Sequence, residues 1–254
     1  MKKQPMSPST PLLLLLDYDG TLTDFTVDPE KSNISNSIRA LLRRLQRNNP
    51  VILVSGRYIS GLERVSGLRH FPMVGTHGFE AKGLPGGLRF ASLSLQRRFK
   101  KEAAALWRAI RPLHAKYPGI HIERKPYSST LHYRGIPMSP SQVRNLHLDF
   151  GRVFRSTVTH RLWTLQDGKK MIEAMPKGFS KGKAVLKILN RFPGRLPIYA
   201  GDDITDISVF KVLGKKGLRV AVGKRIPERW CDIRFKNPRE FLQWLAQFDA
   251  KVKG

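Results

Sequence analysis

The sequence predicts an α/β fold, with a doubly wound, mostly parallel sheet and a smaller inserted α+β domain. Two observations support this prediction. Short apolar runs alternate with segments whose apolar residues recur at helical spacing, first near the N-terminus and again after Gly178. Between these parts, apolar and polar residues roughly alternate in short segments, as in an antiparallel sheet with one wet face. A chain of 254 residues is long enough for such a core and an insert.

The first part of the core is predicted from three strands and one helix. Leu12–Leu16 is uniformly apolar and lies between Pro11 and Gly20, which suits a strand buried on both faces and is too short for a buried helix. Residues 34–45 carry apolar side chains at helical spacing. Residues 50–56 and 71–78 read as two further strands. The β-α-β alternation indicates a doubly wound sheet.

The insert is predicted from a change of pattern after residue 82. Residues 83–90 are rich in Gly and Pro, which is typical of a boundary loop. A long basic helix is expected over residues 95–114 and another over 139–154. Short strands are expected at 119–125, 128–135, 161–166 and 169–175.

The α/β pattern then returns until the end of the chain. Helices are expected at 180–192, 205–213 and 237–248, and strands at 196–203 and 218–223. The predicted division is therefore a core of residues 1–82 and 176–254, with an insert of residues 83–175.

The amino-acid composition is strongly basic. The chain has 46 Lys and Arg against 19 Asp and Glu, a formal net charge of +27. Such a field attracts anions in general, including phosphate esters and nucleic acid. Because the basic residues are spread along the whole chain, the pattern favours a basic solvated surface over a dedicated nucleic-acid site. We expect only nonspecific contact with nucleic acid.

Other features bear on the compartment. A single cysteine, Cys231, excludes a disulfide framework and fits a reducing environment. No apolar run approaches the roughly 20 residues of a membrane helix. The leucine run near the N-terminus is shorter than the roughly 7–15 apolar residues of a signal peptide, and carboxylates end it. We expect a cytoplasmic monomer without a membrane partner.

Polar side chains follow several of the predicted strands. In open α/β sheets, ligands bind outside the carboxyl ends of the strands. Such positions are occupied by the Asp17-Tyr18-Asp19 triplet, by Ser55-Gly56-Arg57 and by Asp202-Asp203, while Lys181 begins a helix.

Asp17 and Asp19 are two residues apart, so an extended chain would point both carboxylates the same way. Burying two unpaired carboxylates costs several kcal/mol each, so a cation is expected beside them. Mg²⁺ is usually held by one or two carboxylates with water and phosphate. An Asp can also attack phosphorus as a nucleophile. For a single Asp before Gly-Thr, turn formation is the simpler interpretation. The second acidic cluster argues against it.

These segments resemble the four motifs of the haloacid dehalogenase superfamily. "DYDGTLT" resembles the first motif, "VILVSGR" the second, "SKGKA" the third and "GDDITD" the fourth, in the superfamily's order. The resemblance covers essentially the whole predicted core. It implies a Rossmann-like core, and an insert between the second and third motifs implies a C2-type cap.

Within that superfamily, the chain most resembles the trehalose-6-phosphate phosphatases. "GTHGFE", "IERKPYSSTLHYR" and "GFSKGKA" match segments of that family, including one in the cap. Two departures stand out. Met175 replaces an arginine that often precedes the third motif, and Ile207-Ser208 replaces acidic residues that often follow the fourth.

The resemblance implies a role for each matching residue. Asp17 is expected to attack phosphorus, and Asp19 to act as general acid and base and to offer its backbone carbonyl to the metal. Ser55 is expected to bind the phosphoryl oxygens and Lys181 to neutralise charge. Asp202 is expected to bind Mg²⁺ directly. The metal set is Asp17, Asp19, Asp202, Asp203 and Asp206, with Asp203 and Asp206 as ligand, water bridge or lysine partner.

Substrate recognition is expected from both domains. The candidates are Gly56, Arg57, His77, Glu80 and Lys82 in or beside the core, and Glu123, Lys125, His132, Arg134 and Glu173 in the cap. For each cap residue, a solvated surface or a cross-strand ion pair is the competing interpretation.

The expected activity is Mg²⁺-dependent hydrolysis of trehalose 6-phosphate through an aspartyl-phosphate. The alternatives are another sugar phosphatase of the superfamily, acting on sucrose phosphate or mannosylphosphoglycerate, and a basic nucleic-acid-binding module on this fold. Cap movement is expected about hinges at residues 83–87 and 176–178.

Overall fold

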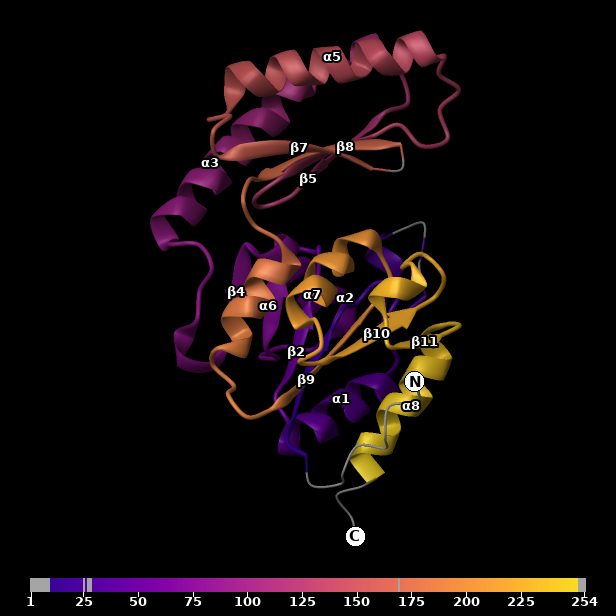
Figure 1. Cartoon of the computed structure of the whole chain (residues 1–254). Helices are drawn as coiled ribbons and strands as arrows, with labels where there is room; N and C mark the ends of the chain where they lie inside the picture. The colour runs from indigo at the N-terminus through magenta and orange to yellow at the C-terminus, as the bar shows by residue number, and fades with distance from the viewer. Residues whose placement is uncertain (1–9, 25, 27–28, 169, 251–254) are drawn as a thin grey trace. The chain divides into compact units, whose positions relative to one another are not determined.

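The chain divides into two compact units, shown in the computed structural model of Figure 1. The structure describes residues 10–24, 26, 29–168 and 170–250. The core unit comprises Met1–Phe90 and Phe179–Gly254, and the cap unit comprises Ala91–Gly178. The domain boundaries at 82/83 and 175/176 stay a prediction. Among the described residues, no helix has both the length and the apolar character that crossing a membrane requires.

The core sheet has seven strands in the order β11-β10-β9-β1-β2-β3-β4. All neighbouring strands are parallel except β4, which is antiparallel to β3. The mostly parallel sheet predicted from the sequence is therefore confirmed. The strands are β1 (Leu12–Leu16), β2 (Val51–Val54), β3 (Met73–Gly75), β4 (Glu80–Lys82), β9 (Leu196–Gly201), β10 (Leu218–Val222) and β11 (Ile233–Phe235).

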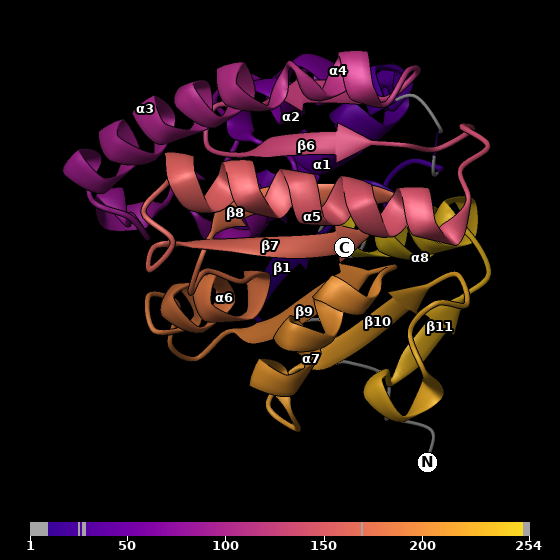
Figure 2. The ribbon, with the colours of Figure 1, turned by 90° about the horizontal axis from the view of Figure 1, so that it is seen from above.

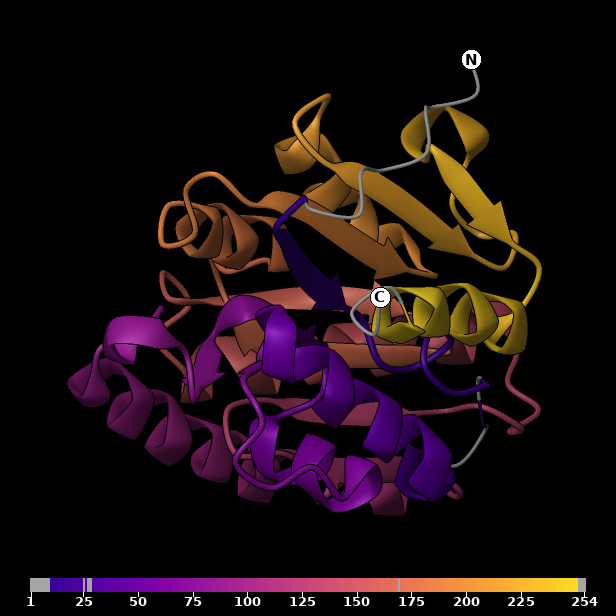
Figure 3. The same ribbon diagram turned by 90° about the horizontal axis from the view of Figure 1, so that it is seen from below.

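Both faces of the core sheet are covered by helices, because side chains of β1 alternate between two apolar clusters. Leu14 packs with residues of α1, α2 and α8. Leu15 packs on the other face with residues of α6 and α7. Figure 3 shows α1 and α8 side by side. The helices are α1 (Asn36–Asn48), α2 (Ile59–Ser66), α6 (Lys181–Leu189), α7 (Ile207–Leu213) and α8 (Pro238–Ala250).

The two outermost strands, β4 and β11, were missed by the sequence reading. Each has three residues, all of them only half-buried, so neither shows an apolar run or a clear alternation. Tertiary pairing to β3 and β10 makes them strands. Short 3₁₀ turns occur at Pro29–Lys31, Thr76–Gly78, Pro85–Gly87, Ile204–Asp206 and Glu228–Trp230.

The cap unit is a four-stranded antiparallel sheet in the order β5-β6-β8-β7, with helices against one face. Figure 2 shows α3 and α5 running side by side over the strands. This matches the α+β insert expected from the sequence. The elements are α3 (Leu93–Ile110), α4 (Leu113–Lys116), β5 (His121–Arg124), β6 (Ser129–His132), α5 (Pro140–Thr157), β7 (Trp163–Gly168) and β8 (Met171–Pro176).

One predicted cap helix is wrong at its C-terminal end. Residues 95–114 were expected to form a single helix, but α3 ends at Ile110 and the four-residue α4 begins at Leu113. Pro112 lies between them. It has no N–H to donate and its ring clashes with the preceding turn, so it ends the helix although the apolar spacing continues.

Candidate active site

The candidate site lies at the carboxyl edge of the core sheet, where the central strand β1 has β2 on one side and β9 on the other. Leu16 pairs in register with Leu53 of β2 and with Ala200 of β9. The residues that follow these strands therefore meet at one edge. This register brings Asp17 and the segments of Ser55 and Asp202 together.

Lys181 joins two of the acidic motifs. Its Nζ donates hydrogen bonds to Oδ1 of Asp17 at 2.8 Å and to Oδ1 of Asp206 at 2.8 Å. The lysine is the first residue of α6, and the Ser180 side chain caps that helix by accepting from the N–H of Lys183. Since Lys181 is only 4% exposed, its charge is balanced by these carboxylates and not by water.

Asp206 is held by four donors. Besides Lys181, the Tyr199 hydroxyl donates to its Oδ1 at 2.5 Å. Its Oδ2 accepts from the backbone N–H groups of Asp202 and Asp203, each at 3.0 Å. These contacts use both carboxylate oxygens, so Asp206 fixes the acidic loop and the lysine. Among the alternatives for Asp206, this geometry favours the lysine partner.

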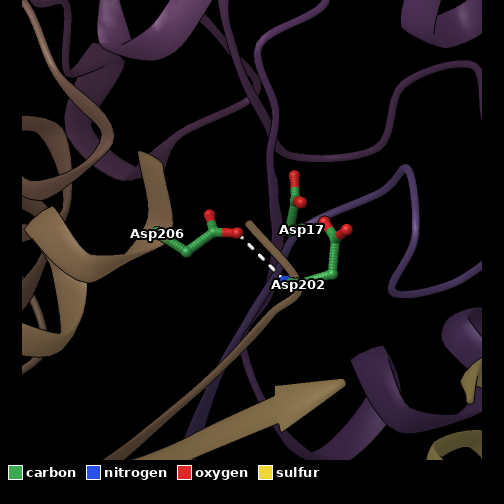
Figure 4. Close-up of side chains that lie close together, drawn as sticks. All are labelled: Asp17, Asp202 and Asp206. Carbon is green, nitrogen blue, oxygen red and sulfur yellow. Dashed lines mark hydrogen bonds between the residues drawn. The ribbon is translucent and has the colours of Figure 1, made fainter. Parts of the chain in front are cut away.

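Three carboxylates converge beside Lys181. Asp17, Asp202 and Asp206 each place one oxygen within 4.8 Å of the others, as Figure 4 shows. Gly20, at φ +76°, makes room for this arrangement. A Cβ there would lie 2.3 Å from Oδ2 of Asp202, and the positive φ itself favours glycine. The carboxylate group is therefore compact and only partly neutralised.

Burial and repulsion among the carboxylates raise the pKa values of Asp17 and Asp202. Burial raises the pKa of Asp17 well above its ordinary value, and Asp206 and Asp202 raise it further against the opposing effect of Lys181. Burial, Asp206 and Asp203 raise the pKa of Asp202 to about 7. The donor set of carboxylate oxygens fits a hard divalent cation, which would relieve this repulsion.

The carboxylate of Asp19 is held separately from this cluster. Arg57 binds it with both ends of its guanidinium, Nε to Oδ2 at 2.6 Å and Nη2 to Oδ1 at 2.7 Å. The Ser32 hydroxyl also donates to Oδ1 at 2.7 Å. Asp203, in turn, lies 3.6 Å from the guanidinium of Arg225. The two acids that the sequence adds to the metal set thus have arginine neighbours.

The second motif forms a tight turn after β2. Ser55 is buried, and its Oγ accepts from the backbone N–H of Arg57 at 3.1 Å. A Cβ on Gly56 would lie 2.6 Å from the His77 ring, so the glycine permits the imidazole to approach. His77 itself adopts φ 52° in the 3₁₀ turn after β3. The structure therefore places Ser55, Gly56, Arg57 and His77 together.

Glu80 and Lys82, on β4, have protein partners. The Glu80 carboxylate accepts from the N–H of Ile59 at 3.2 Å and from the hydroxyl of Thr76. Lys82 pairs with Glu63 at 2.6 Å. These contacts stabilise the junction of β4 with α2, and a substrate role for either residue stays a prediction.

Four of the five predicted cap residues form one cluster. Lys125 Nζ lies 3.0 Å from Glu173 and 3.7 Å from Glu123. The ring of His132 contacts Glu123 at 3.0 Å. The Ser128 hydroxyl donates to Glu173 at 2.8 Å. The strand register puts Glu123, Thr130 and Glu173 in one row, and Arg134, in the loop after β6, is exposed.

Comparison with known proteins decides which family this arrangement belongs to. The family described as Trehalose-phosphatase matches residues 15–229. The chain belongs to the trehalose-phosphatase family. The resemblance inferred from the motifs is therefore confirmed.

Relatives of this trehalose-phosphatase family member extend over most of the chain. It is 30% identical to "Trehalose-6-phosphate phosphatase" of Escherichia coli (strain K12), over 93% of this chain and 86% of that protein. It is 25% identical to "Probable trehalose-phosphate phosphatase 4" of Oryza sativa subsp. japonica, of which it spans 65%. The solved structure of a "trehalose-6-phosphate phosphatase related protein" has a TM-score of 0.78 at 24% identity, covering 95% of this chain and 98% of that one. The last likeness shows the shared fold.

Some residues of this trehalose-phosphatase site were not found from the sequence. Tyr199 lies within an apolar strand and Ser32 in a loop, so neither carries a motif signal. Ser208 is noted above only as a departure from the family's acidic residues. Its Oγ accepts from the N–H of Gly182 at 3.1 Å and donates to the carbonyl of Thr205 at 2.8 Å, which ties the third motif to the fourth.

Proposed function

We propose that this protein hydrolyses trehalose 6-phosphate to trehalose and inorganic phosphate. The observation that carries the proposal is a buried aspartate, Asp17, held at Oδ1 by Lys181 and grouped with Asp202 at the carboxyl edge of a parallel sheet. Membership of the trehalose-phosphatase family supports the reaction class, and the names of the relatives support the substrate.

The proposed reaction has two displacements at phosphorus. An oxygen of Asp17 attacks, the bond between phosphorus and the sugar oxygen breaks, and Asp19 gives a proton to the departing alkoxide. An aspartyl-phosphate remains on Asp17. Asp19 then takes a proton from a water molecule, whose oxygen attacks phosphorus and releases phosphate and the free carboxylate of Asp17. Atoms and protons balance over the two steps.

The neighbours of Asp17 position and neutralise charge, which is most of what phosphoryl transfer requires. Lys181 is held by both Asp17 and Asp206, so its ammonium is fixed where charge develops. The Ser55 hydroxyl accepts from the N–H of Arg57 and keeps its own proton to donate to a phosphoryl oxygen. Asp206 acts through Lys181.

We propose Mg²⁺ as the metal, held by Asp17 and Asp202. When bound, it would neutralise the carboxylates and the phosphoryl oxygens. The raised pKa values of both aspartates support the fit, because a cation is the missing counter-charge. Direct ligation by the side chain of Asp19 has less support, since Arg57 binds both of its carboxylate oxygens. Arg225 lies near both Asp202 and Asp203, at 3.8 and 3.6 Å, and does not distinguish between them.

We propose that the cap cluster of Glu123, Lys125, His132 and Glu173 recognises the sugar. Two carboxylates, an ammonium and an imidazole offer both donors and acceptors to sugar hydroxyls. Because Lys125 offsets one of the two carboxylates and His132 hydrogen-bonds the other, the cluster suits a neutral disaccharide better than a second phosphate. The cytoplasmic location and the monomeric state stay predictions.

A substrate panel tests the proposed function. Phosphate release would be measured from trehalose 6-phosphate, sucrose 6-phosphate, mannosylphosphoglycerate and glucose 6-phosphate, each with Mg²⁺ and with EDTA. We expect the highest kcat/KM with trehalose 6-phosphate and loss of activity in EDTA. A higher kcat/KM with another sugar phosphate would change the proposed substrate but leave the proposed phosphatase reaction standing. No release from any of them would refute the proposal.

A further inference from the structure

We propose that Ser32 and Arg57 are positioning residues for Asp19. They hold its carboxylate in the orientation in which it gives a proton to the departing sugar oxygen. This inference rests on the proposed function, because it assigns two residues to the general acid of that reaction. Ser32 lies outside every motif considered above.

The contacts around Asp19 form a three-donor clamp. Arg57 uses Nε and Nη2, at 2.6 and 2.7 Å, and Ser32 uses its hydroxyl, at 2.7 Å. Oδ1 accepts from both residues and Oδ2 accepts from Arg57. Paired donors from a planar guanidinium fix the plane of a carboxylate, and the hydroxyl adds a third fixed point. The carboxylate therefore has one well-defined orientation.

Both donors are themselves anchored. The hydroxyl of Tyr18 donates to the carbonyl of Ser32 at 2.7 Å, which ties the loop before α1 to the first motif. The carbonyl of Arg57 accepts from the N–H of Thr76 at 2.7 Å, and its N–H donates to Ser55. The guanidinium carbon lies 5.8 Å from the centre of the Tyr18 ring. The clamp thus joins the first motif, the second motif and the loop at Ser32.

A fixed orientation has a chemical purpose here. The side chain of Asp19 is 31% exposed, so without the clamp it could take up several rotamers in contact with water. Proton transfer requires the acid within hydrogen-bond reach of the leaving oxygen, and misplacement by about 1 Å can cost on the order of 100-fold. Asp17, by contrast, is already fixed by Lys181.

A substitution at Ser32 can distinguish a positioning role from a role in substrate binding. Ser32 is fully buried, at 0% exposure, so its hydroxyl, which donates to Asp19, cannot contact the substrate. Arg57 is 14% exposed at its side chain and a direct contact with substrate would be harder to separate. Ser32→Ala is therefore the primary variant. Ser37→Ala is the matched control, because Ser37 is exposed, lies nearby in α1 and has its hydroxyl 2.7 Å from that of Ser35.

The test compares two leaving groups. Trehalose departs as a poor leaving group that needs a proton, whereas p-nitrophenolate departs as a stable anion without one. The ratio kcat/KM reports the steps up to release of the alcohol, so it isolates proton donation from the later hydrolysis of the aspartyl-phosphate. We expect Ser32→Ala to lower kcat/KM about 10-fold for trehalose 6-phosphate, and less than about 2-fold for p-nitrophenyl phosphate. Ser37→Ala should change neither.

A double-mutant cycle tests whether Ser32 acts through Asp19. In the Asp19→Asn background, Ser32→Ala should change kcat/KM for trehalose 6-phosphate by less than about 2-fold, because the group it positions is gone. Arg57→Lys keeps the charge but loses the paired donors, and should show the same leaving-group selectivity. Circular dichroism and a thermal melt of each variant establish that it is folded.

The outcomes are distinguishable. Equal losses on both substrates, or an undiminished effect of Ser32→Ala in the Asp19→Asn background, would overturn the positioning role. If the wild-type protein releases no phosphate from trehalose 6-phosphate, the proposed function fails instead. In that case the same variants are compared on whichever sugar phosphate of the panel is hydrolysed, and equal losses there would overturn the positioning role as well.

Discussion

The core and the cap each contain a cluster of charged side chains, and the two clusters differ in their balance. In the core, Asp17, Asp202 and Asp206 converge beside one ammonium, that of Lys181. In the cap, Glu123 and Glu173 meet Lys125 and His132. The core cluster has three carboxylates beside the buried Lys181 and the half-exposed Arg225, whereas the cap cluster has two carboxylates beside Lys125 and the imidazole of His132.

One carboxylate from each cluster shows this difference, because the pKa of Asp202 is raised and that of Glu123 is lowered. In the core, burial and neighbouring carboxylates raise the pKa of Asp202 to about 7. In the cap, burial alone would raise the pKa of Glu123, but the hydrogen bond from His132 and the charge of Lys125 lower it below its ordinary value. This difference supports the proposals that the core site takes up a cation and that the cap cluster binds neutral hydrogen-bonding groups.

The largest expected effect comes from removing the nucleophile in the core. Asp17→Asn should lower kcat at least about 1,000-fold, because an amide cannot form the acyl phosphate. Phosphate release from trehalose 6-phosphate measures it. Glu123→Gln in the cap, in contrast, should act mainly on KM. Unchanged turnover in Asp17→Asn would refute the nucleophile assignment.

Removing the lysine should destabilise the protein more in the core cluster than in the cap cluster. Lys181→Met leaves Asp17 and Asp206 buried without their counter-ion, which should lower the free energy of unfolding by about 3–5 kcal/mol in EDTA. Lys125→Met should cost only about 1–3 kcal/mol, since Ser128 and His132 still hydrogen-bond the two glutamates and the site is partly exposed. Urea denaturation measures both. A larger loss for Lys125→Met than for Lys181→Met would contradict the expectation that the core cluster depends more on its lysine.

Metal addition should stabilise the core cluster. At 100 times the dissociation constant, Mg²⁺ should add about 2.7 kcal/mol to the free energy of unfolding. Because the folded pKa of Asp202 is raised to about 7, the folded state binds this proton more tightly than the unfolded state, and the resulting stability is lost as pH rises from about 4 to about 7. The rise in Tm with Mg²⁺ should therefore be larger at pH 8 than at pH 5.5.

Asp202→Asn provides the control for metal addition. It should remove most of the Mg²⁺-dependent rise in Tm, whereas Asp149→Asn, in the cap and paired with Lys116, should leave that rise unchanged. An equal rise in wild type and Asp202→Asn would place the metal elsewhere.

The smallest expected loss of stability comes from removing a hydroxyl group that donates a hydrogen bond to a carboxylate of either cluster. Tyr199→Phe removes one of the donors to Asp206 and should cost about 1 kcal/mol of stability. Ser128→Ala removes one donor to Glu173 and should cost a similar amount. Thermal unfolding measures both, and Tyr133→Phe, at the half-buried contact with His147, is the control. A loss above about 3 kcal/mol for Tyr199→Phe would mean that Tyr199 does more than hydrogen-bond Asp206.

The sequence by itself determined the local elements and the identity of the chemical groups. The apolar run before Asp17 is a strand because five consecutive leucines can all be buried only between two helical layers. Lys181 and Asp202 could be identified from the sequence, because the local pattern places Lys181 at the start of a helix and Asp202 at the end of a strand. The sequence did not predict the short edge strands β4 and β11 or the helix break at Pro112, because apolar spacing carries little information about them.

Only the tertiary structure decided which groups touch. Asp17 and Lys181 are 164 residues apart, and their hydrogen bond exists because parallel pairing of β1 with β9 brings α6 to the same edge. Lys181 also bonds Asp206, which follows β9. Pairing of β1 with β2 brings Arg57 to Asp19, and the loop before α1 supplies Ser32. Local propensity acts over a few residues, whereas the choice of partner for a buried charge depends on what the whole fold places within about 3 Å of it.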